Sequence, residues 1–469
     1  MFGTTFLGHQ GWLFQGERGC LLVDPLLRED FGDIHALGYR VYPPRELDLG
    51  ALPTLGAIAL THEHDDHFDL PSLAKLDRAT PIYLSVRSST AARVILAEMG
   101  FAVHPLVPGT PVVIGDLELV PGVGDHVGVN CGDEWDTLPF IVRHTGGAGS
   151  FFTMVDITLT EAHVAWASSR LARPGLVTWT NNALDWSHMT DYMTERDEGT
   201  QQCFLRMGVG HKLIATTWGT PAAMLMCAGG FAFAGDKAWL NERVFCVDTD
   251  AVCAQMAHVY KKEKFYAARP GQTWWMKNGK LDRVEARAPW LGTAPPETWP
   301  SRLKVVAPAA APDFLPATGR AAVTADELAE IRTLLADLAG ALVGGLVFRG
   351  LCSLLASEVP AGREPTFALV LRDGDTRRTF VYAATACAFE ERADAATTLA
   401  GMECYASDLR AVLRGELGPI ALTYGRARLW NALPKRFRFD LFGELYRVSH
   451  PLRHPAATLQ VYRRILSTL

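Results

Sequence analysis

Residues 61–69, with the sequence THEHDDHFD, constrain this chain more than any other segment. They follow the apolar run AIAL, which is typical of a buried strand, and they contain the pattern H-x-H-x-D-H. Side chains at positions i and i+2 of an extended chain share a face, so His62 and His64 can reach one cation from the end of this strand. If the chain then turns into a helix, Asp66 and His67 can hold a second cation.

The types of side chain in this motif indicate the kind of metal. Imidazole and carboxylate groups form a borderline ligand set that suits Zn or Fe and not Ca or Mg. A solvated polar turn in front of a helix is the alternative interpretation of such a segment. Four ligand-type residues within six positions, directly after a buried strand, favour the metal site.

Composition limits the other classes of function. The chain has 469 residues, with 45 Lys and Arg against 51 Asp and Glu and no basic block, so no nucleic-acid partner is expected. The longest apolar run, residues 338–348, is shorter than the roughly 20 residues that cross a bilayer, so no transmembrane helix is expected. The N-terminus does not resemble a signal peptide, and the nine cysteines form no C-x-x-C pair. We therefore expect a cytoplasmic protein with reduced thiols.

The pattern of the chain changes near residue 288. Before it, short β-like runs alternate with helix-like stretches such as residues 88–98, which indicates an α/β or α+β arrangement. Residues 288–322 are rich in Pro and Ala and show little periodicity, as in an extended linker. The sequence therefore predicts a catalytic domain at 1–287 and a second domain at 323–469.

The motif and its surroundings resemble the metallo-β-lactamase fold superfamily. The resemblance covers about the first 290 residues and also rests on GHQGWLFQG, GCLLVDP, PGVGDH and FFTMVDIT, which occur in the order that this superfamily has. It implies an α/β fold, an αββα sandwich, for the first domain. It also implies the ligands of two metal ions: His62, His64 and His126 for the first, and Asp66, His67 and Asp156, which can bridge the ions, for the second.

Other residues near these ligands have supporting or competing roles. Asp24 and Thr61 are expected to contact ligand side chains rather than metal, with Asp24 orienting a histidine. Three acidic residues compete for the role of His126: Asp125, Asp133 and Glu134.

The late strand-like run MLMCAGGFAF, residues 224–233, departs from the pattern of hydrolases with two zinc ions. Those enzymes complete the second metal with a histidine after this strand, but the run contains no His, Asp or Glu. His188 is the substitute candidate, since His211 falls in a helix-like run where a core or surface role is favoured. The sequence thus predicts an open position on the second metal.

An open position favours oxygen chemistry. The segment CAGGFAFAGDKAWLNE, residues 227–242, is similar to the late strand of the cytidine-monophosphate N-acetylneuraminate hydroxylase branch, which shares its fold with diiron β-hydroxylases. The favoured function is therefore a diiron, O2-dependent oxygenase that hydroxylates or N-oxygenates a small molecule, with Asp66, Asp156 and His188 at the reacting centre. The chain has no Cys-His pairs for a Rieske cluster, so electrons would come from an external donor or from the substrate.

Two alternatives remain open at this point. A dizinc hydrolase would use a bridging hydroxide, oriented by Asp66 or Asp156, to attack an ester, amide, phosphoester or sulfate ester. A non-catalytic binding protein on the same fold is the second alternative, and the intact H-x-H-x-D-H argues against it.

The second predicted domain begins with a helix. Thr324 and Glu327 have the spacing of a capping box, and leucines and Ile331 recur every three to four residues behind them. The following runs, TFALVLRDG, RRTFVYAAT, CAFEER and a final strand in PIALTYGRARLWN, resemble the sterol-carrier-protein-2-like fold. This resemblance implies a cavity for an apolar part of the substrate. The alternative is a packing or dimerisation domain in a homodimer.

Overall fold

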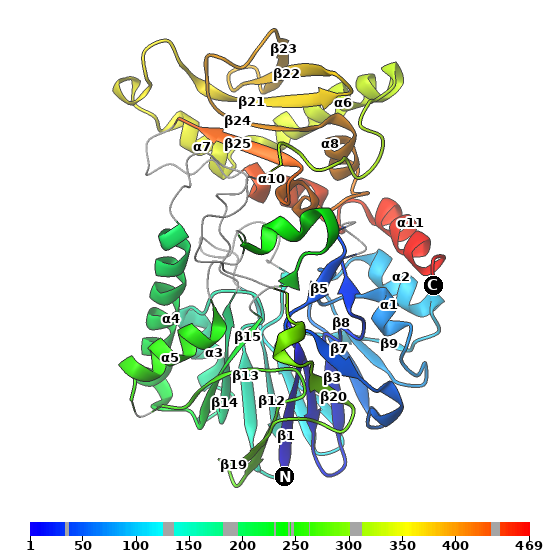
Figure 1. The fold of residues 1–469 in the computed structure, drawn as a ribbon, viewed down its shortest axis with the longest axis vertical. Coiled ribbons are helices and arrows are strands. Elements are labelled where there is room, and N and C mark those ends of the chain that lie inside the picture. Colours follow the sequence, from blue (N-terminus) through cyan, green and yellow to red (C-terminus); the bar gives the residue numbers. More distant parts are fainter. Residues whose placement is uncertain are drawn as a thin grey trace.

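Two β-sheets face each other in the N-terminal part of the molecule, and a third sheet lies at the opposite end (Figure 1). The structure is a computed structural model, in which residues up to 300 are called the N-terminal part and residues from 312 the C-terminal part. It describes residues 1–32, 37–124, 136–181, 196–228, 231–242, 244, 248–261, 263–300, 312–432 and 441–469.

The first sheet has eight strands. The strand pairs from β19 to β3 are antiparallel, whereas the pairs from β3 to β9 are parallel. Parallel strands are covered on both faces, which explains the unbroken apolar runs CLLV and AIAL. The strand order is β19 (Lys280–Glu285), β18 (Thr273–Lys277), β1 (Phe2–Gly8), β2 (Gly11–Gln15), β3 (Cys20–Val23), β7 (Ala57–Leu60), β8 (Ile82–Ser85) and β9 (Val103–Leu106).

The second sheet has seven strands and is antiparallel at one side and parallel at the other. Because the two sheets pack face to face, the carboxyl end of β13 lies close to the carboxyl end of β7 in the first sheet. The strand order is β10 (Val112–Ile114), β11 (Leu117–Pro121), β12 (Phe140–His144), β13 (Ser150–Thr153), β14 (Leu176–Asn181), β15 (Ala223–Ala228) and β17 (Phe265–Ala267).

Apolar side chains fill the space between these sheets, among them Phe14, Phe151 and Trp274. Separate apolar clusters join each outer face to its helices. The order of layers is therefore helix, sheet, sheet, helix, which confirms the predicted αββα sandwich. The first sheet is covered by α1 (Leu70–Leu73), α2 (Thr90–Glu98) and α11 (Pro455–Leu466), and the second by α3 (Glu161–Ser168), α4 (Arg196–Trp218) and α5 (Thr249–Val259).

Short strands extend the sandwich. Strand β20 (Leu291–Thr293) lies within the predicted linker segment 288–322 and pairs with β6 (Arg45–Leu47). Trp290 and Leu291 are buried in the cluster beneath α1 and α2. A second small sheet is formed by β16 (Phe231–Ala232), β5 (Tyr39–Val41) and β4 (Asp30–Phe31).

The C-terminal part is built on a five-stranded sheet. Helix α6 begins at the predicted capping box of Thr324 and Glu327. The run PIALTYGRARLWN is strand only in its last part, because Gly425 has a φ of 84°, which interrupts an extended backbone. The sheet order is β23 (Ala388–Arg392), β22 (Thr376–Ala383), β21 (Glu364–Asp373), β24 (Thr398–Tyr405) and β25 (Ala427–Asn431), and the helices are α6 (Ala325–Leu342), α7 (Leu346–Cys352), α8 (Ala406–Leu413), α9 (Ile420–Thr423) and α10 (Leu441–Ser449).

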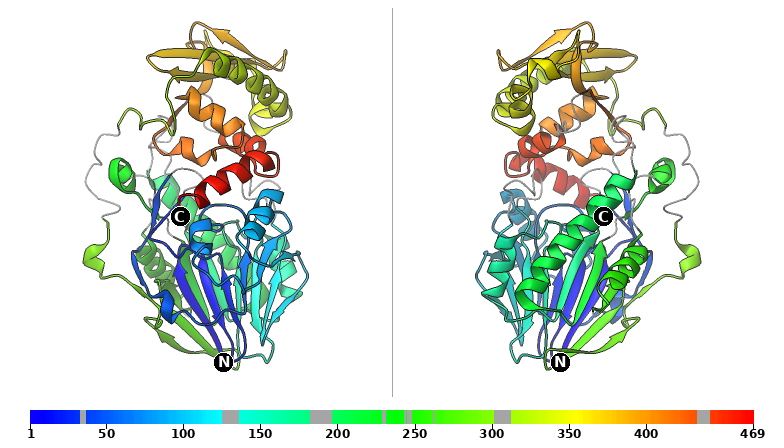
Figure 2. Two further views of the ribbon diagram at one scale, coloured as in Figure 1. Left: turned by 90° about the vertical axis from the view of Figure 1, so that its right-hand side faces the viewer. Right: turned by 90° about the vertical axis from the view of Figure 1, so that its left-hand side faces the viewer.

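The C-terminal part packs directly on the sandwich. One apolar cluster contains Phe31 and Tyr39 together with Tyr424, and the rings of Tyr39 and Tyr424 are 5.7 Å apart. The last helix, α11, returns to the sandwich beside α2 (Figure 2), where the rings of Phe68 and Tyr462 are 5.4 Å apart. The two parts therefore share buried surface at two places.

In the described part of the chain, no single helix is long and apolar enough to cross a bilayer, and α6 and α7 meet that test only as a pair that is bent by 68°.

Candidate metal centre

The H-x-H-x-D-H motif follows β7 at its carboxyl end. The backbone amides of His67 and Phe68 both bond to the carbonyl of His64, at 2.9 and 2.6 Å, so the chain folds into a tight turn. This turn ends at Asp69, whose side chain caps α1. It gathers the imidazoles: the ring of His62 lies 4.4 Å from that of His64 and 4.1 Å from that of His67.

The first group of donor atoms consists of two imidazole nitrogens. Nε2 of His62 is 3.0 Å from Nδ1 of His64, so the two nitrogens face each other. His62 is fully buried, and this burial, together with the neighbouring His67 and His64, holds its pKa well below the usual value. A neutral imidazole is the form that binds a metal ion.

The second group contains one histidine of the motif, its neighbouring aspartate and a histidine from another segment. Nε2 of His67 is 3.8 Å from Oδ2 of Asp66, and the same carboxylate oxygen is 2.7 Å from Nε2 of His9. Ligand atoms of these three residues all lie within 4.8 Å of one another.

Asp156 lies between the two groups. Its Oδ2 atom is 2.7 Å from Nε2 of His67 and 3.9 Å from Nε2 of His62. The three side chains form a second set whose ligand atoms lie within 4.8 Å of one another. One carboxylate thus reaches both positions, which is the arrangement that a bridging ligand requires.

The contacts of His67 test whether a cation fits here. Both of its nitrogens face carboxylate oxygens, Nδ1 at 2.8 Å from Asp24 and Nε2 at 2.7 Å from Asp156. Burial alone would lower the pKa of His67, but Asp66, Asp156 and Asp24 raise it well above its usual value. The position beside Nε2 therefore favours a positive charge, and the residues present fit a metal ion.

Asp24 and Thr61 lie in contact with two histidines of the motif. Asp24 accepts hydrogen bonds from the Thr61 amide at 2.8 Å and from the Thr61 hydroxyl at 2.6 Å, and it also contacts His67. Because the Thr61 hydroxyl donates to Asp24, it can accept from Nδ1 of His62, 3.0 Å away. That contact leaves Nε2 of His62 as the lone-pair nitrogen.

Gln10, next to His9, holds the carboxylate of Asp156. Its side-chain amide donates to Oδ1 of Asp156 at 3.1 Å and to the carbonyl of Val155 at 3.0 Å. Its carbonyl oxygen accepts from the thiol of Cys227, 3.3 Å away. The segment GHQ between β1 and β2 therefore supplies one group of the second cluster and one support of Asp156.

Backbone strain is concentrated around this centre. Six non-glycine residues of the described chain have positive φ angles, and four of them adjoin the site: His9, Asp24, Val155 and Ala228. Such conformations cost of order 1–3 kcal/mol each and are kept where the surrounding structure requires them.

The structure brings most of the sequence-predicted site residues together, and the others fall elsewhere. His62, His64, Asp66, His67 and Asp156 converge, with Asp24 and Thr61 beside them. His211 instead lies in α4 and faces Glu263 at 3.0 Å. The predicted residues outside the described part of the chain are His126, His188, Asp125, Asp133 and Glu134.

Sequence reasoning missed three residues near the centre, namely His9, Asp136 and His450. His9 had a usable signal, because it stands in GHQG at the end of an apolar strand, as the motif histidines do. Asp136 and His450, which lie 3.6 Å apart, have no such local signal.

Glu63, between the first two histidines of the motif, connects the centre to the C-terminal part. Its buried carboxylate accepts hydrogen bonds from the Ser89 hydroxyl at 2.7 Å, from the Ser89 amide and from the Tyr462 hydroxyl at 2.8 Å. Burial raises the pKa of Glu63, and these donors counteract that shift. Helices α2 and α11 therefore both hold the loop that carries His62 and His64.

The Tyr462→Phe variant tests this connection. Loss of one donor to a buried carboxylate is expected to destabilise the protein by about 1–3 kcal/mol, since the ring still fills its place beside Phe68. The measurement is chemical unfolding. The control is Tyr83→Phe, because no hydrogen bond of the Tyr83 hydroxyl is seen among the described residues; equal stability of Tyr462→Phe and the wild type would contradict the role of this bond.

Comparison with known proteins finds a family match for part of the chain. Residues 20–215 match the model of the β-lactamase superfamily domain. None of the curated proteins matches the sequence significantly.

Several solved structures are similar to part of this chain. A possible metal-dependent hydrolase from Veillonella parvula is 14% identical, with 59% of this chain and 100% of that chain covered and a TM-score of 0.40. The isothiocyanate hydrolase from Delia radicum gut bacteria is 15% identical, with 59% and 99% covered and a TM-score of 0.39. CmlA, a diiron β-hydroxylase from Streptomyces venezuelae, is 17% identical, with 56% and 52% covered and a TM-score of 0.35. This chain thus spans about half of the length of CmlA.

Proposed function

Since residues 20–215 match the model of the β-lactamase superfamily domain, we propose that this chain is a dinuclear metal-dependent enzyme that hydrolyses a small-molecule substrate. One observation carries the proposal: side-chain donor atoms from three separate segments converge at the ends of β1, β7 and β13. The donors are His9, His62, His64, Asp66, His67 and Asp156.

These donors divide between two ions. His62 and His64 would hold the first, together with His126 as the sequence analysis expects. Asp66, His67 and His9 would hold the second, and Asp156 would bridge. All of these ligand atoms are imidazole nitrogens or carboxylate oxygens, a set that suits Zn and Fe.

When bound, the two ions supply Lewis acidity and a water of lowered pKa at the reacting centre. The chain's own residues do the positioning. Gln10 holds Asp156 through Oδ1, which leaves Oδ2 directed toward both groups. Burial alone would raise the pKa of Asp66, but the neighbouring His67 and His9 lower it well below its usual value, so its carboxylate is ionised and would orient the attacking water.

The position of His9 beside Asp66 favours a hydrolase over an oxygenase. The sequence analysis favours a diiron oxygenase because the late strand has no ligand, and β15 indeed carries no His, Asp or Glu. In the structure, however, His9 lies 2.7 Å from Asp66 and can supply an imidazole to the second ion. His9 therefore replaces the ligand that the late strand lacks. With His9, Asp66 and His67 the second ion would have three protein ligands, the number that a catalytic zinc site uses.

The diiron oxygenase is the second candidate, and one observation favours it. An aromatic cluster shields the second position: the ring of His9 is 5.9 Å from Phe31 and 6.1 Å from Phe231, and Tyr39 and Tyr424 lie behind them. Exclusion of water protects reactive intermediates of oxygen chemistry. Electrons would then come from an external donor or from the substrate.

One experiment separates these candidates. Full-length protein is purified without air and loaded with Zn or Fe(II), and both hydrolysis of ester, amide and phosphodiester probes and O2 consumption are measured. We expect hydrolysis with zinc, its loss with a chelator and its return when zinc is restored. O2 consumption with Fe(II) without hydrolysis would establish the oxygenase, and neither reaction with two bound ions would favour a binding protein.

A further inference from the structure

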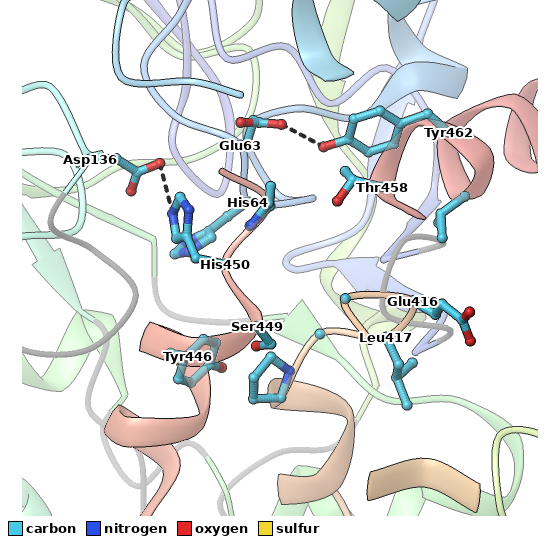
Figure 3. A pocket seen from close by; sticks show the side chains of 15 residues that line it. Glu63, His64, Asp136, Glu416, Leu417, Tyr446, Ser449, His450, Thr458 and Tyr462 are labelled. Carbon is cyan, nitrogen blue, oxygen red and sulfur yellow. Dashed lines mark hydrogen bonds and ion pairs between the residues drawn. The ribbon is translucent and has the colours of Figure 1, made fainter. Parts of the chain in front are cut away.

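A pocket lies where the motif loop meets the C-terminal part of the chain (Figure 3). Glu63, His64 and Asp136 form its wall on the sandwich side, so the pocket reaches the candidate metal centre at His64. The loop 415–419 and the ends of α10 and α11 form the opposite wall. Its volume is about 60 Å³, so it accommodates one end of a small molecule.

The C-terminal wall is largely apolar. Leu417 and Val461 are 6% and 4% exposed, and they line the pocket with Pro419, Pro451 and the ring of Tyr446. Such a wall favours the hydrocarbon part of a ligand.

Asp136 provides a polar group in this apolar surrounding. It is 1% exposed, and its Oδ2 atom lies 3.6 Å from Nε2 of His450. Nδ1 of His450 accepts from the Leu452 amide at 3.2 Å, so Nε2 carries the proton that points to Asp136 (Figure 3). The other oxygen, Oδ1, is buried and has no hydrogen-bond partner among the described residues.

An unpartnered buried carboxylate oxygen is costly, and a donor on a ligand would satisfy it. The charges of the pocket indicate which donor. The 15 described residues that line it include the carboxylates of Glu63, Asp136 and Glu416 but no Lys or Arg. Glu416 is already paired with Arg414, 2.7 Å away, and Glu63 accepts hydrogen bonds from Ser89 and Tyr462, so among the described residues Asp136 is the carboxylate of the pocket that keeps an unpartnered oxygen. An anionic group would be repelled there, whereas a protonated amine would be attracted.

We propose that this pocket binds the amine end of an alkylamine-containing substrate, with the ammonium donating to Oδ1 of Asp136 and the adjoining methylenes against Leu417 and Val461. Binding of the amine does not depend on the proposed function. Only the hydrolysis of the bound substrate at the neighbouring metal centre does. It excludes phosphoesters and sulfate esters as the group held in this pocket.

The test is binding of three matched probes, butylamine, butanol and butyrate, to the zinc-loaded full-length chain, measured by ligand-observed NMR. We expect butylamine to bind about tenfold more tightly than butyrate, because a charge-assisted hydrogen bond to Asp136 is available only to the amine. Equal or tighter binding of butyrate would overturn the proposal.

Variants locate the binding. Asp136→Asn should remove the preference for the amine and leave butanol binding unchanged, whereas Leu417→Trp should fill the pocket and weaken all probes that bind there. Glu416→Gln is the matched control, since its carboxylate is paired with Arg414, and it should leave the preference intact. If Leu417→Trp does not fold, Thr458→Trp narrows the same pocket from α11. A preference for butylamine that survives Asp136→Asn would overturn the proposal.

Failure of this inference and failure of the proposed function give different results. An amine preference lost in Asp136→Asn, without hydrolysis of any probe, supports the pocket and counts against the hydrolase. Hydrolysis of neutral esters with no amine preference supports the hydrolase and overturns the pocket.

Discussion

The Asp156→Ala variant is expected to lose hydrolytic activity by about a thousandfold and to retain fewer metal ions than the wild type. Asp156 is the carboxylate that contacts both donor groups, at 2.7 Å from His67 and 3.9 Å from His62. Without this carboxylate, the two bound metal ions would lose the ligand that they share. The measurements are the rate of hydrolysis of an ester probe and the metal content of each protein after dialysis.

Two controls make the Asp156 result specific. Asp156→Asn keeps the shape and the contact with Gln10 but removes the charge, so it should fall close to Asp156→Ala in activity. Asp282→Ala, which removes an exposed carboxylate of β19, should behave as the wild type. Retention of more than about a tenth of wild-type activity in Asp156→Ala would contradict the bridging role.

The His9→Ala variant is expected to lose the second ion selectively and about a hundredfold in activity. His9 is bonded to Asp66, so its loss removes one imidazole from this position and frees the carboxylate to move. The ion at His62 and His64 should remain. Metal analysis at increasing chelator concentration measures the two affinities separately.

Rescue distinguishes a ligand from a merely structural residue. Free imidazole should enter the space left in His9→Ala and restore binding of the second ion in part. His104→Ala, which removes an exposed histidine of β9, serves as the control. Two ions bound with unchanged affinity in His9→Ala would show that His9 serves only as a hydrogen-bond partner of Asp66.

The convergence of the four motif side chains could be predicted because their spacing is local. A strand end followed by a turn brings His62, His64, Asp66 and His67 together whatever the rest of the fold does. Asp156 could be placed by its position after an apolar strand, within a resemblance that fixes the order of such strands. Both inferences required only short-range geometry.

His9 was missed although it stands in a segment that the resemblance already uses. Its approach to Asp66 depends on the sheet order β1, β2, β3, β7, which brings the β1–β2 turn beside the end of β7. It also depends on a left-handed backbone at His9, with a φ of 52°. Neither the order nor this conformation is visible in the local pattern.

The packing of the C-terminal part against the sandwich could not be predicted for a similar reason. The capping box located the start of α6, but the contact of Tyr462 with Glu63 joins residues 399 positions apart. An amphipathic pattern shows that a helix buries one face, and it does not show which surface covers that face. The closure of the pocket by α10 and α11 therefore appears only in the folded chain.

The number and position of bound ions test the account most directly. Crystals of the full-length chain loaded with zinc, measured at the zinc absorption edge, should show two anomalous peaks per chain. One peak is expected beside His62 and His64 and the other among His9, Asp66 and His67, with Asp156 contacting both. A single fully occupied peak per chain, or a second peak away from His9, would contradict the dinuclear centre proposed for this protein.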